Sequence, residues 1–96
     1  MECYQKIYPE YNEDWLTKGI DLAKLGNFSG SIQSFDEILK INPCYINAWH
    51  NKGVAHQELK NHDSAIKCYD EALKINKNNI ITWYSKGRTL ISQKKF

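Results

Sequence analysis

One pattern recurs three times along this chain with a constant period. Tryptophan stands at positions 15, 49 and 83, so neighbouring copies are 34 residues apart. A Lys-Gly pair at residues 18–19 recurs at 52–53 and 86–87 with the same spacing. Residues 12–45 and 46–79 align without a gap and are identical at 12 of 34 positions. A fixed period of this length predicts a repeat protein, in which one supersecondary unit is copied along the chain.

Each repeat contains two stripes at helical spacing. In the first repeat they are Trp15, Gly19, Leu22 and Leu25, followed by Ile32, Phe35, Ile38 and Leu39. The sequence GNFSG separates the stripes, with Gly26 and Asn27 as helix-stop residues, and Pro43 ends the second helix. Helices this short are unstable alone, so each hairpin must bury its stripes on its own partner helix and on the next hairpin. The pattern therefore predicts a solenoid.

Glycines and lysines stand at repeated positions inside the expected first helices. Gly19, Gly53 and Gly87 each cost about 1 kcal/mol relative to alanine in a helix, so we expect the paired helix to approach closely there. The lysines directly before them are expected to pack their aliphatic stems and extend their ammonium groups into water. The second helices carry two expected i,i+4 ion pairs, Asp36–Lys40 and Asp70–Lys74.

The composition excludes several classes of protein. A chain of 96 residues with 42% hydrophobic and 25% charged residues is typical of a globular domain or a short repeat array. Its apolar runs are far shorter than the roughly 20 residues that span a bilayer, so no membrane association is predicted. The first residues, MECYQKIYPE, lack the features of a signal peptide, which favours a cytoplasmic chain. A net charge of +2 without a basic face argues against nucleic-acid binding.

Neither catalysis nor metal binding is predicted. The histidines at 50, 56 and 62 are spaced by six, which does not place them on one helix face. The three cysteines show no CxxC spacing, so we expect reduced thiols and neither a zinc site nor a disulfide framework. The chain contains no HExxH motif, no Ser/His/Asp set and no glycine-rich phosphate loop. We therefore expect a protein that is not an enzyme and needs no cofactor.

The repeated residues resemble the tetratricopeptide repeat family, whose pattern is W-x2-L-G-x2-Y, then A-x3-F, then A and P. The first repeat matches at Trp15, Gly19, Phe35 and Pro43 and departs at Leu22 and Ser31. The second matches at Trp49, Gly53, Ala65, Tyr69 and Ala72 and departs at His56 and Lys77. Lysine occupies the leucine position in all three copies. The resemblance implies an all-α fold, a right-handed α-solenoid of antiparallel helix hairpins.

Alignment with the family pattern divides the chain into four segments. We expect them to form one domain over residues 1–96. Residues 1–11 correspond to the end of a preceding second helix, 12–45 to repeat 1, 46–79 to repeat 2, and 80–96 to the first helix of an incomplete repeat 3. These ends favour a fragment of a longer array over a short protein with unusual ends. Because an open solenoid end exposes apolar side chains, Trp83, Leu90 and Phe96 are candidates for self-association.

The resemblance implies a protein–protein interaction module that binds a peptide or a partner helix in a concave groove lined by the first helices. The groove residues that it implies are Glu13, Leu16, Thr17 and Ile20, then Asn47, His50, Asn51, Val54 and Gln57, and finally Ile81, Tyr84, Ser85 and Arg88. Some members grip a C-terminal carboxylate with Lys, Asn, Asn, Lys and Arg. The corresponding residues here are Leu16, Ile20, Asn51, Ile81 and Ser85, so only Asn51 fits and a carboxylate clamp is not expected.

The same residues are compatible with other structures and functions. The groove side chains could instead pack on neighbouring repeats. The chain could be a structural segment that forms a homo-oligomer, with the N-terminal segment of one copy covering the last helix of another, head to tail. RNA recognition by related helical-hairpin repeats is disfavoured, because those repeats lack this Trp and Gly signature and the net charge here is small.

Overall fold

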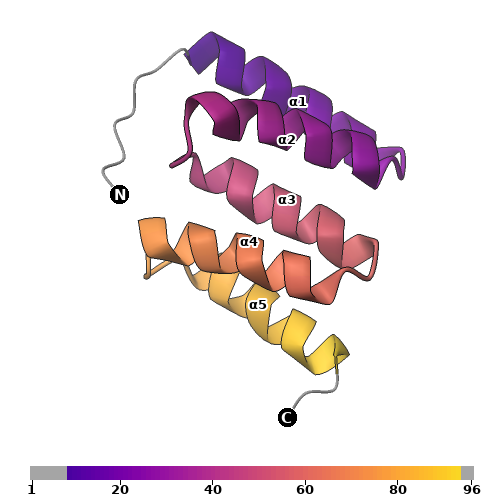
Figure 1. Cartoon of the computed structure of the whole chain (residues 1–96), viewed down its shortest axis with the longest axis vertical. Helices are drawn as coiled ribbons and strands as arrows, with labels where there is room; N and C mark the ends of the chain where they lie inside the picture. Colours follow the sequence, from indigo (N-terminus) through magenta and orange to yellow (C-terminus); the bar gives the residue numbers. More distant parts are fainter. Residues whose placement is uncertain (1–8, 94–96) are drawn as a thin grey trace.

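The computed structural model describes residues 9–93, with side chains from residue 13 onward. Its five helices are α1 (Pro9–Lys24), α2 (Phe28–Ile41), α3 (Ile46–Glu58), α4 (His62–Ile75) and α5 (Ile80–Ser92). Each helix packs on the helices before and after it in sequence, and Figure 1 shows the stack running from α1 to α5. No strand occurs between residues 9 and 93. The predicted all-α solenoid is confirmed.

The turns inside the two hairpins end their first helices in the same way. Gly26 has φ of 82°, and Lys60, one period later, has φ of 66°. Both values lie in the left-handed region, where glycine fits without strain and lysine does not. After the first turn, the side chain of Asn27 accepts a hydrogen bond from the Gly30 amide at 2.9 Å and caps α2. The predicted helix stop at residues 26–27 is therefore confirmed.

Helix α1 begins at Pro9, inside the segment 1–11 that the sequence assigns to a preceding helix. Proline suits the first turn of a helix, because its missing N–H has no intrahelical partner there. The expected division of the chain into repeats stays a prediction. Residues 1–8, which belong to its first segment, lie outside the described residues. None of the helices between residues 9 and 93 has the length and apolar composition of a transmembrane span.

The two helices of each hairpin come into close contact at a glycine of the first helix. We call the space beside such a glycine its notch. A Cβ on Gly53 would lie 2.5 Å from Tyr69 Cε1, so the ring of α4 occupies the space that a side chain on α3 would need. Gly19 and Phe35 make the same contact between α1 and α2. Both rings are fully buried. The predicted close approach is confirmed at these two glycines, whereas nothing in the described chain lies within 4 Å of a Cβ built on Gly87.

The last leucine of each first-helix stripe does not join the core. Leu25 is 83% exposed, and Leu59 is 39% exposed. Helices α1 and α3 end at Lys24 and Glu58, so both leucines lie in the turns rather than on a packed helix face. The expectation that they complete the stripes is wrong.

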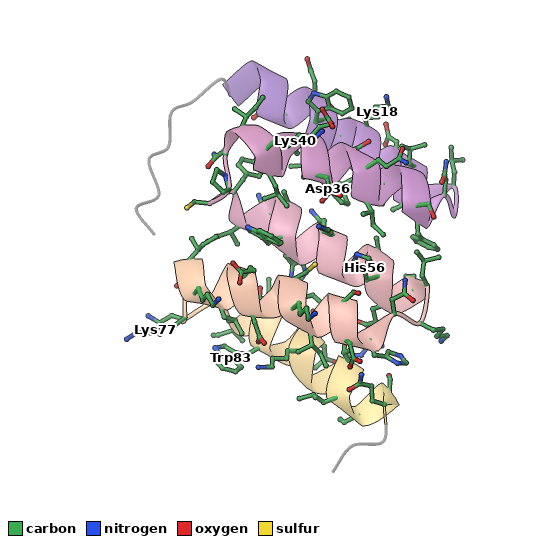
Figure 2. The ribbon with its side chains drawn as sticks, in the orientation of Figure 1. Lys18, Asp36, Lys40, His56, Lys77 and Trp83 are labelled. Carbon is green, nitrogen blue, oxygen red and sulfur yellow. The ribbon has the colours of Figure 1, made fainter. Side chains whose placement is uncertain are left out.

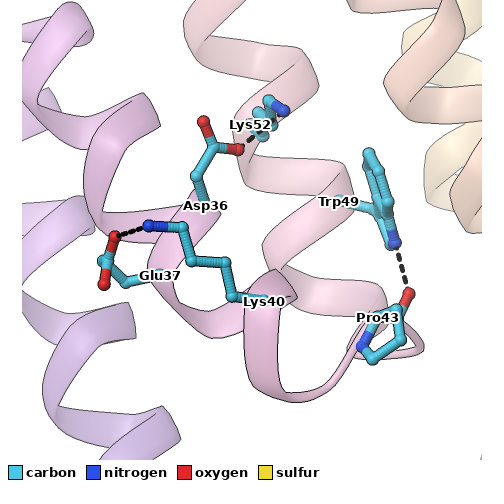
Figure 3. Close-up of polar contacts among 6 residues, drawn as sticks. All are labelled: Asp36, Glu37, Lys40, Pro43, Trp49 and Lys52. Atoms are coloured by element: carbon cyan, nitrogen blue, oxygen red, sulfur yellow. Dashed lines mark hydrogen bonds and ion pairs between the residues drawn. The ribbon is translucent and has the colours of Figure 1, made fainter.

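Consecutive hairpins are joined by two contacts that occur in both repeats. The indole Nε1–H of Trp49 donates to the Pro43 carbonyl at 2.7 Å, and Trp83 makes the same bond to the Lys77 carbonyl at 2.7 Å. Lys52 forms an ion pair with Asp36 at 2.7 Å, and Lys86 does so with Asp70 at 2.7 Å (Figure 3 shows the contacts of Trp49 and Lys52). These two tryptophans and two lysines therefore connect a first helix to the hairpin before it.

These ion pairs correct two expectations. The predicted i,i+4 pairs Asp36–Lys40 and Asp70–Lys74 are wrong, because the lysines pair instead with Glu37 and Glu71 at i,i+3 (Figure 3 shows the pair of Lys40 and Glu37). The ammonium groups of Lys52 and Lys86 are ion-paired and do not extend freely into water. Their side chains are only 20% and 24% exposed, and a lysine side chain that is largely buried needs an anionic partner. The two aspartates supply it from the neighbouring helix.

The buried cysteines differ in state. Cys44 is disulfide-bonded, so the expectation of reduced thiols is wrong at this position. Cys68 is a free thiol, and burial raises its pKa to about 11. A thiol with a raised pKa is seldom ionised and therefore a poor nucleophile.

Candidate functional site

The first helices of the hairpins lie next to one another. Helix α3 contacts both α1 and α5, in addition to its own hairpin partner α4. The three helices that carry the predicted groove residues therefore form one continuous layer. We call their shared surface the first-helix face.

The predicted groove residues differ in exposure on this face. Six are exposed, namely Glu13, Thr17, Asn47, Ile81, Tyr84 and Arg88. Seven are half-buried, namely Leu16, Ile20, His50, Asn51, Val54, Gln57 and Ser85. Leu16 and Ile20 pack against the core cluster formed by Phe35, Ile38 and Ala48. A half-buried side chain can pack inside the protein or remain accessible to a ligand. The contacts of each side chain distinguish these two cases.

A hollow of about 350 Å³ opens between α1 and α3. It is lined by Ile20, Ala23, Lys24, Phe28, Phe35, Asn51, Val54, Ala55 and Glu58. We call it the Ile20–Val54 hollow. Most of the lining is apolar, and Lys24 and Glu58 are its exposed charged residues. It brings together three residues of the predicted groove, Ile20, Asn51 and Val54.

Sequence reasoning missed the other residues of this hollow. Phe28 belongs to the first turn of α2, and Glu58 to the last turn of α3. The prediction considered only one face of each first helix. Helix periodicity could have added Ala23 and Ala55, which stand three and four residues from Ile20 and Asn51. The contribution of Phe28 depends on how two hairpins stack, and no local signal shows it.

Two predicted polar groove residues are engaged inside the chain. Gln57 Oε1 accepts hydrogen bonds from the Tyr69 hydroxyl at 2.8 Å and from the Thr89 hydroxyl at 2.9 Å. His50 Nδ1 lies 3.3 Å from the Thr82 hydroxyl oxygen. These contacts tie α3 to α4 and α5. Burial lowers the pKa of His50, which favours the neutral imidazole.

Helix α5 carries three of the exposed residues of the predicted set, Ile81, Tyr84 and Arg88. Ile81 is 68% exposed and Tyr84 is 66% exposed. The Arg88 guanidinium carbon lies 5.8 Å from the centre of the Tyr84 ring, which is a cation–π distance. An exposed apolar residue, an aromatic ring and a cation are thus presented together. Of the predicted self-association residues, Trp83 is 51% exposed, Leu90 is half-buried, and Phe96 lies outside the described residues.

A second hollow, of about 520 Å³, lies between α3 and α4. Its lining is more charged and includes Lys52, His56, Lys67, Asp70, Glu71 and Lys74, together with Trp49, Ser64 and Cys68. Lys52 and Lys74 are already paired with Asp36 and Glu71. Among residues 9–93, no group of three or more His, Cys, Asp and Glu side chains could hold a metal ion. The Ile20–Val54 hollow, with its apolar walls, is the better candidate for a ligand.

A sequence model of the tetratricopeptide repeat matches residues 46–79, the segment that contains α3 and α4. Residues 46–79 form a tetratricopeptide repeat. A search among curated proteins found no match.

Two solved structures share the fold of this chain. One is the TPR2AB-domain:pHSP90 complex of yeast Sti1, with a TM-score of 0.87 and 19% identity over 93% of this chain. The other is the first TPR of Spaghetti (RPAP3) bound to the HSP90 peptide SRMEEVD, with a TM-score of 0.83 and 17% identity over 91% of this chain. The match covers 34% of the Sti1 chain and 70% of the Spaghetti chain. At these identities the likeness concerns the fold.

Proposed function

We propose that this chain is a protein-interaction module that binds a peptide or an amphipathic helix along its first-helix face. The observation that carries the proposal is the Ile20–Val54 hollow, an apolar depression between α1 and α3. The exposed Ile81 and Tyr84 extend apolar surface onto α5. Apolar side chains of a helical or extended ligand fit such a surface, because their burial drives association. The proposal requires no catalysis.

The expected ligand is apolar rather than strongly acidic. The structures of Sti1 and Spaghetti contain HSP90 or an HSP90 peptide, and three of the last four residues of the Spaghetti ligand SRMEEVD are acidic. In this chain the positions that a carboxylate clamp would need hold Leu16, Ile20, Ile81 and Ser85, with Asn51 as the single match. Arg88 can hold one acidic group, and at the hollow the charge of Lys24 is offset by that of Glu58. We therefore propose an amphipathic ligand with apolar anchors and at most one acidic residue facing the protein.

The test is selection of peptides from a random library on the 96-residue chain, followed by affinity measurements by fluorescence polarisation. The variant Val54→Glu places a carboxylate in the wall of the hollow and is expected to weaken selected peptides at least tenfold. Leu25→Glu is the matched control, because Leu25 is 83% exposed and lies outside the hollow. SRMEEVD is expected to bind at least tenfold more weakly than the selected peptides.

Two outcomes contradict the proposal. Equal weakening by Val54→Glu and Leu25→Glu would mean that the peptides bind elsewhere. Tight binding of SRMEEVD would mean that the expected preference for apolar ligands is wrong. Circular dichroism of both variants shows whether the helices are retained.

A second candidate function is self-association of this segment through its ends. The exposure of Trp83 favours it, because leaving such a side chain in water forgoes roughly 1.5–3 kcal/mol. Sedimentation over a range of concentrations tests it, with Trp83→Ala as the variant. A monomer at every concentration would eliminate this candidate.

A further inference from the structure

Neighbouring first helices are separated by two equivalent intervals whose linings differ in polarity. The Ile20–Val54 hollow occupies the interval between α1 and α3, and the interval between α3 and α5 lies one period further along the chain. Four apolar wall residues of the hollow have polar counterparts 34 residues later: Gln57 for Ala23, Tyr69 for Phe35, Arg88 for Val54 and Thr89 for Ala55. The first interval is therefore apolar where the second is polar.

The side chain of Gln57 occupies the second interval. Its Oε1 accepts hydrogen bonds from the hydroxyl groups of Tyr69 at 2.8 Å and Thr89 at 2.9 Å. These two residues are the counterparts of Phe35 and Ala55, which are walls of the first hollow. The Gln57 amide thus lies where the first hollow is open, because an alanine stands at the equivalent position of α1.

Gln57 is held in this position by buried partners. Tyr69 and Thr89 are both 0% exposed, so neither hydroxyl group can exchange its bond to Gln57 for one to water. Displacing the amide would leave the buried Tyr69 hydroxyl without its acceptor, which costs free energy. His56, the preceding residue, is labelled on α3 in Figure 2 and lines the other hollow, between α3 and α4. Gln57 therefore closes the second interval to apolar side chains of a ligand.

Arg88 gives the second interval a positive charge. Its counterpart in the hollow is Val54, and its exposed guanidinium group lies beside the Tyr84 ring. Helix α5 carries no acidic residue, and no carboxylate in the described part of the chain forms an ion pair with Arg88. Glu58, the acidic residue at the end of α3, lines the hollow together with Lys24. An acidic side chain of a ligand can therefore pair with Arg88.

We propose that Gln57 determines the specificity of the first-helix face, which accepts an extended peptide with one apolar anchor in the hollow and an acidic side chain at Arg88. The inference rests on the function proposed above and adds the spacing of the two contacts. A helical ligand needs a continuous row of apolar anchors, and the polar interval interrupts that row. Contacting helices have axes about 8–10 Å apart, and an extended peptide advances about 3.3 Å per residue. The acidic residue is thus expected about three positions from the anchor.

The probe is the tightest-binding peptide selected on the 96-residue chain, and an alanine scan identifies its anchor as the apolar residue whose replacement costs most affinity. The residues two to four positions from the anchor, on either side, are then replaced in turn by Asp, Asn and Leu. Affinities are measured by fluorescence polarisation. We expect one of these positions to favour Asp at least tenfold over Asn and over Leu. With Arg88→Met, which changes an exposed residue, the preference for Asp over Asn should fall below twofold.

The role of Gln57 is tested by a triple variant, Gln57→Ala with Tyr69→Phe and Thr89→Ala. It gives the second interval the residue types that line the first hollow and removes the two hydroxyl groups that donate to Gln57. The peptide with Leu at the responsive position should bind this variant at least tenfold more tightly than it binds the unchanged chain.

Two results overturn the inference. One is equal affinity of the unchanged chain for Asp and Leu at every position tested. The other is unchanged affinity of the Leu peptide for a triple variant whose circular dichroism is native. If the triple variant does not fold, the comparison of Asp with Leu and the effect of Arg88→Met still decide. Val54→Glu separates this inference from the peptide function, because a peptide that it weakens but that shows none of these preferences contradicts only the role of Gln57.

Discussion

Lys52 Nζ lies 2.7 Å from Asp36 Oδ1, so the first helix of the second hairpin is ion-paired to the second helix of the hairpin before it. The same ammonium group lies 5.4 Å from the centre of the Trp49 ring. Lys86, Asp70 and Trp83 repeat this arrangement one period later. Where the family pattern has leucine, this chain has a lysine, and that lysine joins adjacent hairpins.

Removing the charge of Asp36 is expected to destabilise the chain modestly. Asp36→Asn should lower the free energy of unfolding by about 0.5–1 kcal/mol, because the pair is partly exposed and water screens it. Urea denaturation at low and high salt measures the effect, which should shrink as salt increases. A double-mutant cycle with Lys52→Met isolates the pair. A coupling energy of zero would show that the ion pair does not hold the hairpins together.

The glycine notches predict opposite results for one substitution at two equivalent positions. Gly53→Ala places a Cβ 2.5 Å from Tyr69 Cε1 and is expected to cost about 1–3 kcal/mol, typical of overpacking. Gly87→Ala meets open space and should stabilise the helix by up to about 1 kcal/mol. Thermal denaturation of both variants measures the difference. Equal destabilisation by the two substitutions would contradict the open notch.

Lys60 is expected to be a strained position that glycine relieves. Its φ of 66° is left-handed, and the equivalent residue in the first repeat is Gly26. Lys60→Gly should raise the free energy of unfolding by about 0.5–1 kcal/mol, because the left-handed region costs other residues about 1–2 kcal/mol. Gly26→Ala is the reciprocal variant and should be destabilising. Chemical denaturation of the pair provides the measurement, and destabilisation by Lys60→Gly would refute the assignment of strain.

Stability should decrease as the pH falls below neutrality. The pKa of His50 is lowered by burial, and that of His56 by burial and by nearby Lys52, with Asp36 acting in the opposite direction. Below about pH 6.5 the unfolded chain therefore binds more protons than the folded chain, and the free energy of unfolding falls until the folded-state pKa values are passed. Denaturation between pH 7.5 and 5.5 measures the slope. The double variant His50→Gln, His56→Gln should flatten it, and a slope unchanged in that variant would assign the effect to other groups.

Part of the candidate site followed from the sequence. The resemblance to the tetratricopeptide repeat implied that Ile20, Asn51 and Val54 line one groove, and the structure brings them into one hollow. The resemblance did not reveal that Gln57 and His50 would be hydrogen-bonded to α4 and α5. A repeat pattern specifies the position of a side chain on its own helix, but not which group of a neighbouring hairpin it meets.

The sequence by itself determined the period, the hairpins and the close approach of the paired helix at Gly19 and Gly53. These features depend on helix periodicity and on packing between helices that are adjacent in sequence. Only the tertiary structure decided that Asp36 pairs with Lys52 rather than Lys40, that Phe28 lines the hollow, and that the notch of Gly87 stays open. The physical reason is that these outcomes depend on how one hairpin is placed against the next. That placement is set by the packing of whole helix faces and not by spacing along the chain.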